Sequence, residues 1–126
     1  MTEATLTWFA NLMDNLSIPY DFMEWKEKPP EDYYFTGSYI ETETMDSQES
    51  NHFQYVFILR GVTRKDWMLL ERAKAKIQRN AKAIRTVLPD GTGLAVSYAT
   101  GDEVPTGDAS LKGIKINLNV DEWRVN

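Results

Sequence analysis

Apolar residues near the start of the chain recur every three or four positions, which is the period of a helix with one buried face. The pattern predicts a helix over residues 2–16, and Trp8 and Leu12 broaden its apolar face. Pro19 ends it, because the residue before a proline is pushed out of the helical region. We expect this helix to pack deeply into the core, in preference to a helix that also contacts a partner. The positions that define its face are Leu6, Phe9, Ala10, Met13 and Leu16.

Three strands are predicted between residues 20 and 60. The first, over 20–25, is rich in aromatic residues, and the second covers 33–44. The third, over 52–60, alternates most clearly. Its second face, with Val56 and Ile58, is also apolar, which predicts a central strand covered on both sides. The polar, acidic segment 46–51 is typical of a hairpin tip.

A second helix is predicted after Gly61, which we expect to break the preceding strand. Thr63 and Asp66 have the spacing of a capping box and open this helix. Its apolar stripe runs for about five turns and ends before the turn at 89–93. The stripe consists of Leu70, Ala73, Ile77, Ala81, Ile84 and Leu88.

Two more strands are predicted at 93–100 and 114–120, separated by a flexible acidic loop at 101–110. In the last strand apolar and polar residues alternate, which predicts one dry face and one wet face. The order is therefore helix, three strands, helix, two strands. This order predicts an α+β fold with a mostly antiparallel sheet of about five strands packed with two helices. A chain of 126 residues suits one domain spanning residues 1–126.

The composition indicates a globular protein and excludes several kinds of site. Contents of 42% hydrophobic and 26% charged residues are those of a globular chain. No apolar run approaches the roughly 18 residues that span a bilayer, and the amino terminus does not have the pattern of a signal peptide. The absence of cysteine excludes disulfides, thiolate zinc sites and cysteine nucleophiles.

The charge is distributed unevenly. Nine of the fourteen basic residues lie between Arg60 and Arg85, opposed there only by Asp66 and Glu71. This stretch carries a net charge of +7, which leaves −12 for the remainder because the whole chain carries −5. On a helical wheel most of the basic residues fall opposite the apolar stripe of the second helix. They are Lys65, Arg72, Lys76 and Arg79, with Arg64 and Lys82 beside them.

Three interpretations of this basic face are open. It can be a solvated surface balanced by acidic loops of the same subunit. It can contact an acidic surface of an identical neighbour, and such head-to-tail contacts close into rings or grow into filaments. It can bind phosphates of a nucleic acid, which is disfavoured by the negative overall charge and by loops without interleaved aromatic and basic residues.

No arrangement of residues identifies a catalytic or metal site. His52 is the only histidine, and we interpret Asp46, Glu49 and His52 as solvated loop residues. There is no Gly-x-Ser-x-Gly elbow, and the glycines at 91–93 follow a helix, the reverse of a phosphate-binding turn. A hydrolase with two carboxylates stays open, although nothing singles out a pair among 19 acidic residues. We expect a non-enzymatic protein without cofactor or metal.

The order of elements has a resemblance to a known family. It is carried by Tyr-Tyr-Phe-Thr-Gly-Ser-Tyr-Ile-Glu at 33–41, Tyr-Val-Phe-Ile-Leu-Arg-Gly at 55–61 and the helix opening Thr-Arg-Lys-Asp-Trp at 63–67. Over nearly its whole length the chain resembles the small tail-completion and tail-terminator proteins of long-tailed bacteriophages and prophages. The resemblance covers architecture and carries no diagnostic motif.

The resemblance implies a structural protein that forms a ring, expected to be hexameric, and joins the tail tube to the head. Its partners would be other tail or head-completion proteins, with no specific nucleic-acid binding and no membrane. It would be located in the virion, or in the host cytoplasm during assembly. The acidic loop with Asp102, Glu103 and Asp108 would project toward a lumen or a partner, since an acidic lumen repels passing DNA.

A second functional hypothesis rests on aromatic residues. Tyr20, Trp25, Tyr34 and Tyr39 could line the pocket of a small bacterial ligand-binding or accessory domain. Aromatic residues at strand spacing more often belong to a core, so this hypothesis ranks second.

Overall fold

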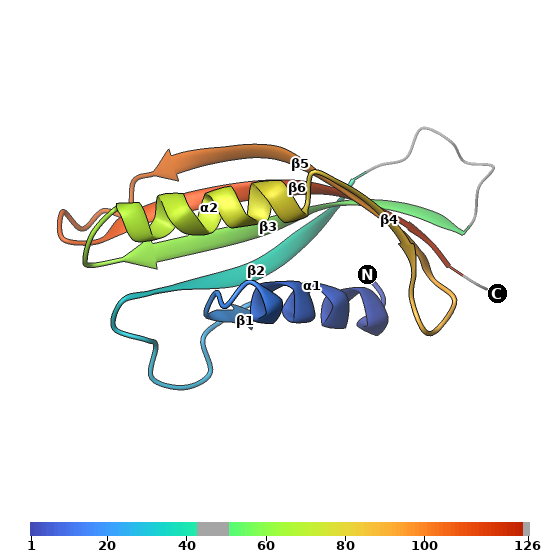
Figure 1. Cartoon of the computed structure of the whole chain (residues 1–126), viewed down its shortest axis with the longest axis horizontal. Helices are drawn as coiled ribbons and strands as arrows, with labels where there is room; N and C mark the ends of the chain where they lie inside the picture. The colour runs from blue at the N-terminus through green and yellow to red at the C-terminus, as the bar shows by residue number, and fades with distance from the viewer. Residues whose placement is uncertain (43–50, 125–126) are drawn as a thin grey trace.

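The computed structural model describes residues 1–42 and 51–124. It contains two helices and a six-stranded sheet, which confirms the α+β class (Figure 1). Residues 46–50 of the expected hairpin tip lie outside the described residues. The elements in chain order are α1 (Glu3–Asn15), β1 (Tyr20–Phe22), β2 (Tyr33–Thr42), β3 (His52–Thr63), α2 (Met68–Asn80), β4 (Ala83–Val87), β5 (Gly93–Val104) and β6 (Lys112–Trp123).

The sheet has the strand order β1-β2-β3-β6-β5-β4. All neighbouring pairs are antiparallel except the first, in which β1 runs parallel to β2 with Tyr20 opposite Phe35. The sheet is therefore mixed, with one strand more than the sequence predicted. The central strand is β3, as expected, because it pairs with both β2 and β6.

The additional strand is β4, which occupies the end of the predicted second helix. Ile84 and Thr86 are half-buried and alternate with exposed Ala83, Arg85 and Val87, which is the period of a strand. Ile84 and Leu88 also satisfy the four-residue spacing of a helix, so the sequence pattern extended α2 too far. Pairing with β5 over its whole length decides the conformation in favour of a strand.

The start of α2 also differs from the prediction. Gly61 lies inside β3, opposite Ile114, and does not break the strand. Thr63 is the last residue of β3, and α2 begins only at Met68. The Met68 backbone N–H donates to Asp66 Oδ1 at 3.0 Å, so Asp66 satisfies one of the free donors at the helix start.

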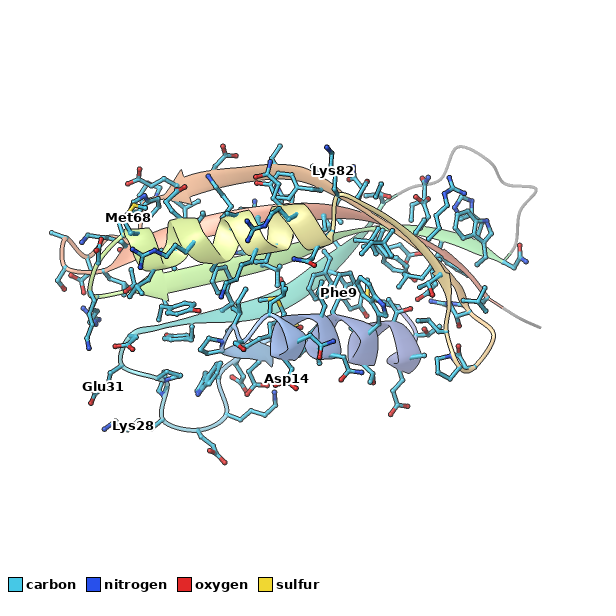
Figure 2. The ribbon with its side chains drawn as sticks, in the orientation of Figure 1. Phe9, Asp14, Lys28, Glu31, Met68 and Lys82 are labelled. Atoms are coloured by element: carbon cyan, nitrogen blue, oxygen red, sulfur yellow. The ribbon has the colours of Figure 1, made fainter. Side chains whose placement is uncertain are left out.

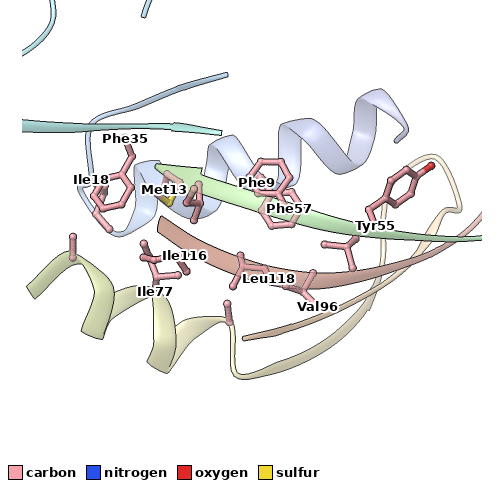
Figure 3. Packing of buried hydrophobic residues seen from close by; sticks show 14 of the residues in the cluster. Phe9, Met13, Ile18, Phe35, Tyr55, Phe57, Ile77, Val96, Ile116 and Leu118 are labelled. Atoms are coloured by element: carbon pink, nitrogen blue, oxygen red, sulfur yellow. The ribbon is translucent and has the colours of Figure 1, made fainter. Parts of the chain in front are cut away.

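Both helices pack on the same face of the sheet; in Figure 1 α2 lies in front of β3 and β6, and α1 lies below β2, beside β1. Phe9 of α1 is stacked on Phe57 of β3, with ring centroids 3.9 Å apart and an interplanar angle of 3°. Figure 3 shows this pair beside Met13, with Ile77 of α2 against Ile116 of β6. These side chains are fully buried, which confirms that α1 packs deeply into the core.

The opposite face of the sheet carries no helix within the described part of the chain. Val56 and Ile58 point to this face, and Val56 is half-buried there, so within the described residues the second face of β3 is covered only in part. Ile58 is nevertheless only 8% exposed. Its register neighbours Ser38 and Asn117 share the same face and shield it, because cross-strand neighbours lie about 5 Å apart.

The acidic loop predicted at 101–110 is shorter than expected. Residues 101–104 belong to β5, and Asp102 lies opposite Lys115 of β6. Gly, Asp and Glu are weak strand formers, but pairing with the long β6 overrides their preference. The remaining turn is closed by Thr106 Oγ1, which donates to the carbonyl oxygen of Leu111 at 2.7 Å.

Candidate subunit interface

The outward side of α2 and Lys82, which lies two residues beyond the end of this helix, together present five exposed residues that combine apolar and basic side chains. Leu70, Ala73 and Ile77 of the same helix are buried against the sheet, so residues on the opposite side of the helix face solvent. Figure 2 labels Met68, the first residue of α2, and Lys82, which lies two residues beyond the last helical residue Asn80. We call this set the α2 ridge: Met68, Arg72, Ala75, Arg79 and Lys82, all of them exposed.

The three cations of the α2 ridge have no acidic partner among the described residues. Arg72, Arg79 and Lys82 take part in none of the ion pairs or side-chain hydrogen bonds within residues 1–42 and 51–124. Met68 is 46% exposed, which is high for a large apolar side chain. A single exposed apolar residue is common on protein surfaces, so the unpaired cations are the feature that suits a partner of opposite charge.

Two of the predicted interface residues lie elsewhere. Arg64 and Lys65 precede α2, so the placement of both on the helix face is wrong, because the helix starts later than predicted. The Arg64 guanidinium is 3.0 Å from Asp108 Oδ2, and Lys65 Nζ is 2.7 Å from Asp32 Oδ1. The hydrogen bond to Asp32 raises the pKa of Lys65. Both cations are thus neutralised within the subunit.

Lys76 has a structural contact inside the subunit. It is half-buried, and its Nζ donates to the carbonyl oxygen of Leu16 at 3.4 Å. Leu16 is the C-cap of α1, where the unpaired carbonyl groups attract a positive charge. Lys76 therefore ties α2 to the end of α1. Of the six cations predicted for the basic face, only Arg72, Arg79 and Lys82 therefore have no partner among the described residues.

The predicted acidic loop residues are not brought together. Asp102 and Glu103 are neighbours in β5 and point to opposite faces of the sheet, whereas Asp108 lies in the turn before β6. Hydrogen bonds from Ser110, followed by those from Arg64, lower the pKa of Asp108 to about 2. Asp108 is therefore already satisfied within the turn, and the three carboxylates do not form one acidic surface.

A shallow groove of about 410 Å³ runs beside the α2 ridge, between this helix and β5. It is lined by Ala75, Gln78, Arg79, Lys82 and Tyr98. Burial raises the pKa of the Tyr98 phenol, so this group stays neutral at physiological pH. The groove therefore offers an apolar floor and two cations, which suits an acidic partner with an apolar side chain.

The aromatic residues of the alternative hypothesis do not line one pocket. Tyr39 packs against Phe22 and Tyr55 on the helix-covered face, and Tyr20 lies on the same face. Trp25 and Tyr34 form a separate pair, with centroids 5.3 Å apart. In the register of β2 and β3, Tyr34 belongs to the opposite face of the sheet.

His52 packs against the last strand. Its ring is stacked on Trp123 with centroids 4.6 Å apart, and its Nε2 is 3.0 Å from Asp121 Oδ1. The other two residues considered with it, Asp46 and Glu49, lie outside the described residues. Within the described ranges, no group of three or more His, Asp and Glu side chains is placed to hold a metal ion.

A buried carboxylate that sequence reasoning missed holds the start of α1. Glu122 of β6 is completely buried. Its Oε2 accepts from Thr5 Oγ1 at 2.6 Å and from the Thr2 backbone N–H at 3.0 Å, and its Oε1 accepts from Arg124 Nε at 2.8 Å. Burial disfavours the charge, but these hydrogen bonds outweigh it and lower the pKa of Glu122. The residue anchors α1 to the sheet through the positive end of the helix dipole.

A signal for this anchor exists in the sequence. Ile114, Ile116, Leu118 and Val120 are buried at alternate positions of β6, and Glu122 is the next residue in that series. Strict alternation places its carboxylate on the buried face, where it requires hydrogen-bond donors.

No protein-family model matches the chain, and no match is found among curated proteins. Solved structures do match. One of them superposes with a TM-score of 0.64 at 17% identity, covering 99% of this chain and 99% of its own. At this identity the likeness shows that the fold is shared. None of the helices in the described ranges has the length and apolar character needed to span a membrane.

Proposed function

We propose that this protein is a non-enzymatic structural component of a bacteriophage or prophage tail, acting as a ring-forming tail terminator or head–tail joining protein. The observation that carries the proposal is the α2 ridge. Three unpaired cations lie beside an exposed methionine in a chain whose net charge is −5. In this proposal the ridge contacts an acidic surface of the next subunit.

Electrostatics favours a contact of this kind. The three cations of the α2 ridge repel one another weakly in the free subunit, and an acidic partner relieves that repulsion. A basic surface that meets a different, acidic surface of an identical copy makes a heterologous contact. Such contacts close into a ring when the rotation between neighbours is a whole fraction of a turn.

The position in a phage tail rests on the resemblance in element order. The resemblance implies the order of a long first helix, three strands, a second helix and closing strands. The terminal strands differ from that expectation by the insertion of β4, which lengthens the sheet without changing the order of the earlier elements. Contacts to tail and head-completion proteins belong to the same proposal.

The solution mass of the purified protein tests the proposal. We expect multi-angle light scattering over a concentration series to give a closed oligomer whose size does not grow further with concentration. We expect the oligomer to dissociate as salt rises from 0.05 to 1 M, which are approximate working values, because the Debye length falls from above 10 Å to about 3 Å. Negative-stain images should show rings.

A matched pair of variants distinguishes a specific contact from general charge effects. Arg72→Glu with Arg79→Glu reverses two charges of the α2 ridge and should abolish the oligomer. Arg85→Glu reverses an exposed cation on β4, outside the ridge, and should leave the oligomer intact. A monomer at every salt and protein concentration in the wild-type chain contradicts self-assembly.

A further inference from the structure

A second groove lies on α1, away from the α2 ridge. It has a volume of about 440 Å³ and runs between α1 and the turn that joins β4 to β5. Ala4, Trp8, Leu88 and Pro89 supply apolar walls. Trp8 is only half-buried in this groove. An open apolar groove of this kind suits a helix of a partner.

The rim of this groove is acidic. Glu3 on α1 and Asp90 in the β4–β5 turn lie on its two sides. Asp14, three turns further along α1, is exposed on the same face of the helix as Glu3. Glu3 and Asp14 take part in none of the ion pairs among the described residues. Glu3 at the rim and Asp14, which lies beyond the groove on the same face of α1, therefore supply two carboxylates without an ion-pair partner among the described residues.

We infer that this α1 groove receives the α2 ridge of a second copy of the chain. The inference rests on the proposed function and adds the surface that the ridge contacts. In the complex the exposed Met68 and Ala75 enter the apolar groove beside Trp8. The cations of the ridge then face the carboxylates of the rim.

The spacing of the charges supports this pairing. Arg72 and Arg79 are seven residues apart on α2, about 10 Å at the helical rise, and Lys82 lies just beyond the end of the helix, whereas Glu3 and Asp14 are eleven residues apart on α1, about 16 Å. An antiparallel arrangement places Arg72 near Asp14 and Lys82 near Glu3. Both surfaces have apolar residues at the centre. The ridge adds unpaired cations and the α1 side adds unpaired carboxylates, so the two surfaces are complementary in charge.

The two surfaces cannot satisfy each other within one subunit. Lys76 holds α2 beside the end of α1, which leaves the ridge on the outside of the molecule. The groove opens on another side of α1, next to Leu88 and Asp90. A contact between them therefore joins two copies. The pair still has one unoccupied ridge and one unoccupied groove, so further copies can add until the assembly closes into a ring.

Reciprocal charge reversal tests the inference. The ridge variant is Arg72→Glu with Lys82→Glu, and the groove variant is Glu3→Lys with Asp14→Lys. Glu24→Lys, in the exposed loop after β1, is the control for the groove variant. Circular dichroism and thermal melting of each variant confirm that it is folded before sedimentation velocity and light scattering are measured.

We expect each double variant to raise the concentration for half-assembly at least tenfold. An equimolar mixture should assemble like the wild type, because the intact ridge of the groove variant meets the intact groove of the ridge variant, and the two charge-reversed surfaces also attract each other. Combining all four substitutions in one chain should restore assembly, since the charges are then exchanged across the interface.

The outcomes separate the two claims. If the ridge variant is monomeric but the groove variant assembles like the wild type, the α1 groove is not the counter-surface and the ridge keeps its proposed role. If the ridge variant assembles like the wild type, the proposed function loses its supporting observation and the inference falls with it. A mixture that stays monomeric while both variants are folded overturns the pairing of these two surfaces.

Discussion

Replacement of Glu122 by glutamine is the most informative perturbation of the fold. The side chain keeps its volume and loses its charge at a completely buried position. The carboxylate accepts hydrogen bonds from Thr2, Thr5 and Arg124 at 2.6 to 3.0 Å. The glutamine oxygen can still accept from the two threonines, but its amide group then opposes Arg124 Nε, donor against donor.

The size of the effect follows from these contacts. A hydrogen bond to a charged group contributes about 1.5–3 kcal/mol, and a neutral one about 0.5–1.5 kcal/mol. The bond to Arg124 is lost and the bonds to the threonines weaken, whereas the partial exposure of Arg124 lets water compensate it. We expect Glu122→Gln to lower the free energy of unfolding by about 2–4 kcal/mol at pH 7.

Urea unfolding followed by tryptophan fluorescence measures this difference, with Glu103→Gln on the exposed part of β5 as control. Because the folded-state pKa of Glu122 is lowered, its stabilisation is complete above the unfolded value near 4.5 and is lost as pH falls through the folded value. The difference between wild type and Glu122→Gln should therefore shrink at acidic pH. A difference below about 0.5 kcal/mol at pH 7, the usual range for a surface change, refutes the reasoning.

Three further predictions concern other parts of the molecule. Phe9→Ala removes the ring stacked on Phe57 and should lower the free energy of unfolding by about 3–5 kcal/mol, and a loss below 1 kcal/mol would contradict the packing. Gly37→Ala places a Cβ 2.5 Å from Tyr20 Oη and 2.8 Å from Phe57 Cζ, so urea unfolding should show a loss of about 1–3 kcal/mol, which an unchanged midpoint would disprove. Asp108 should titrate with a pKa of about 2 in carboxyl-detected NMR, whereas a value near its usual 3.8 would mean that the Ser110 and Arg64 hydrogen bonds do not persist in solution.

The candidate interface could be predicted only in part from the distribution of charge along the sequence. The sequence identifies a basic stretch between Arg60 and Arg85, and that stretch does include the α2 ridge. It does not show which cations are free, because ion pairs join residues far apart in the chain. Arg64 pairs with Asp108 and Lys65 pairs with Asp32, over separations of 44 and 33 residues. Only the folded chain reveals that Arg72, Arg79 and Lys82 remain without partners among the described residues.

The acidic side of the proposed contact could not be derived from the sequence. Glu3 and Asp90 lie 87 positions apart, yet they border one groove because the β4–β5 turn reaches α1. That proximity depends on β4, which the sequence pattern assigned to the second helix. Ile84 and Leu88 fit a helix and a strand equally well by spacing, and pairing with β5 makes the choice.

Local patterns in the sequence were sufficient for α1, for the existence of a second helix but not its bounds, for the alternation of β3 and β6 and for the buried position of Phe9, because each depends on the periodicity of neighbouring residues. They were also sufficient for the α+β class, which follows from the order of the elements. The parallel pairing of β1, the strand β4, the extension of β5 and the buried hydrogen bonds of Glu122 depend on contacts between distant segments. Tertiary structure decided these features, since strand pairing and the burial of a charge are settled by the partner that the fold supplies.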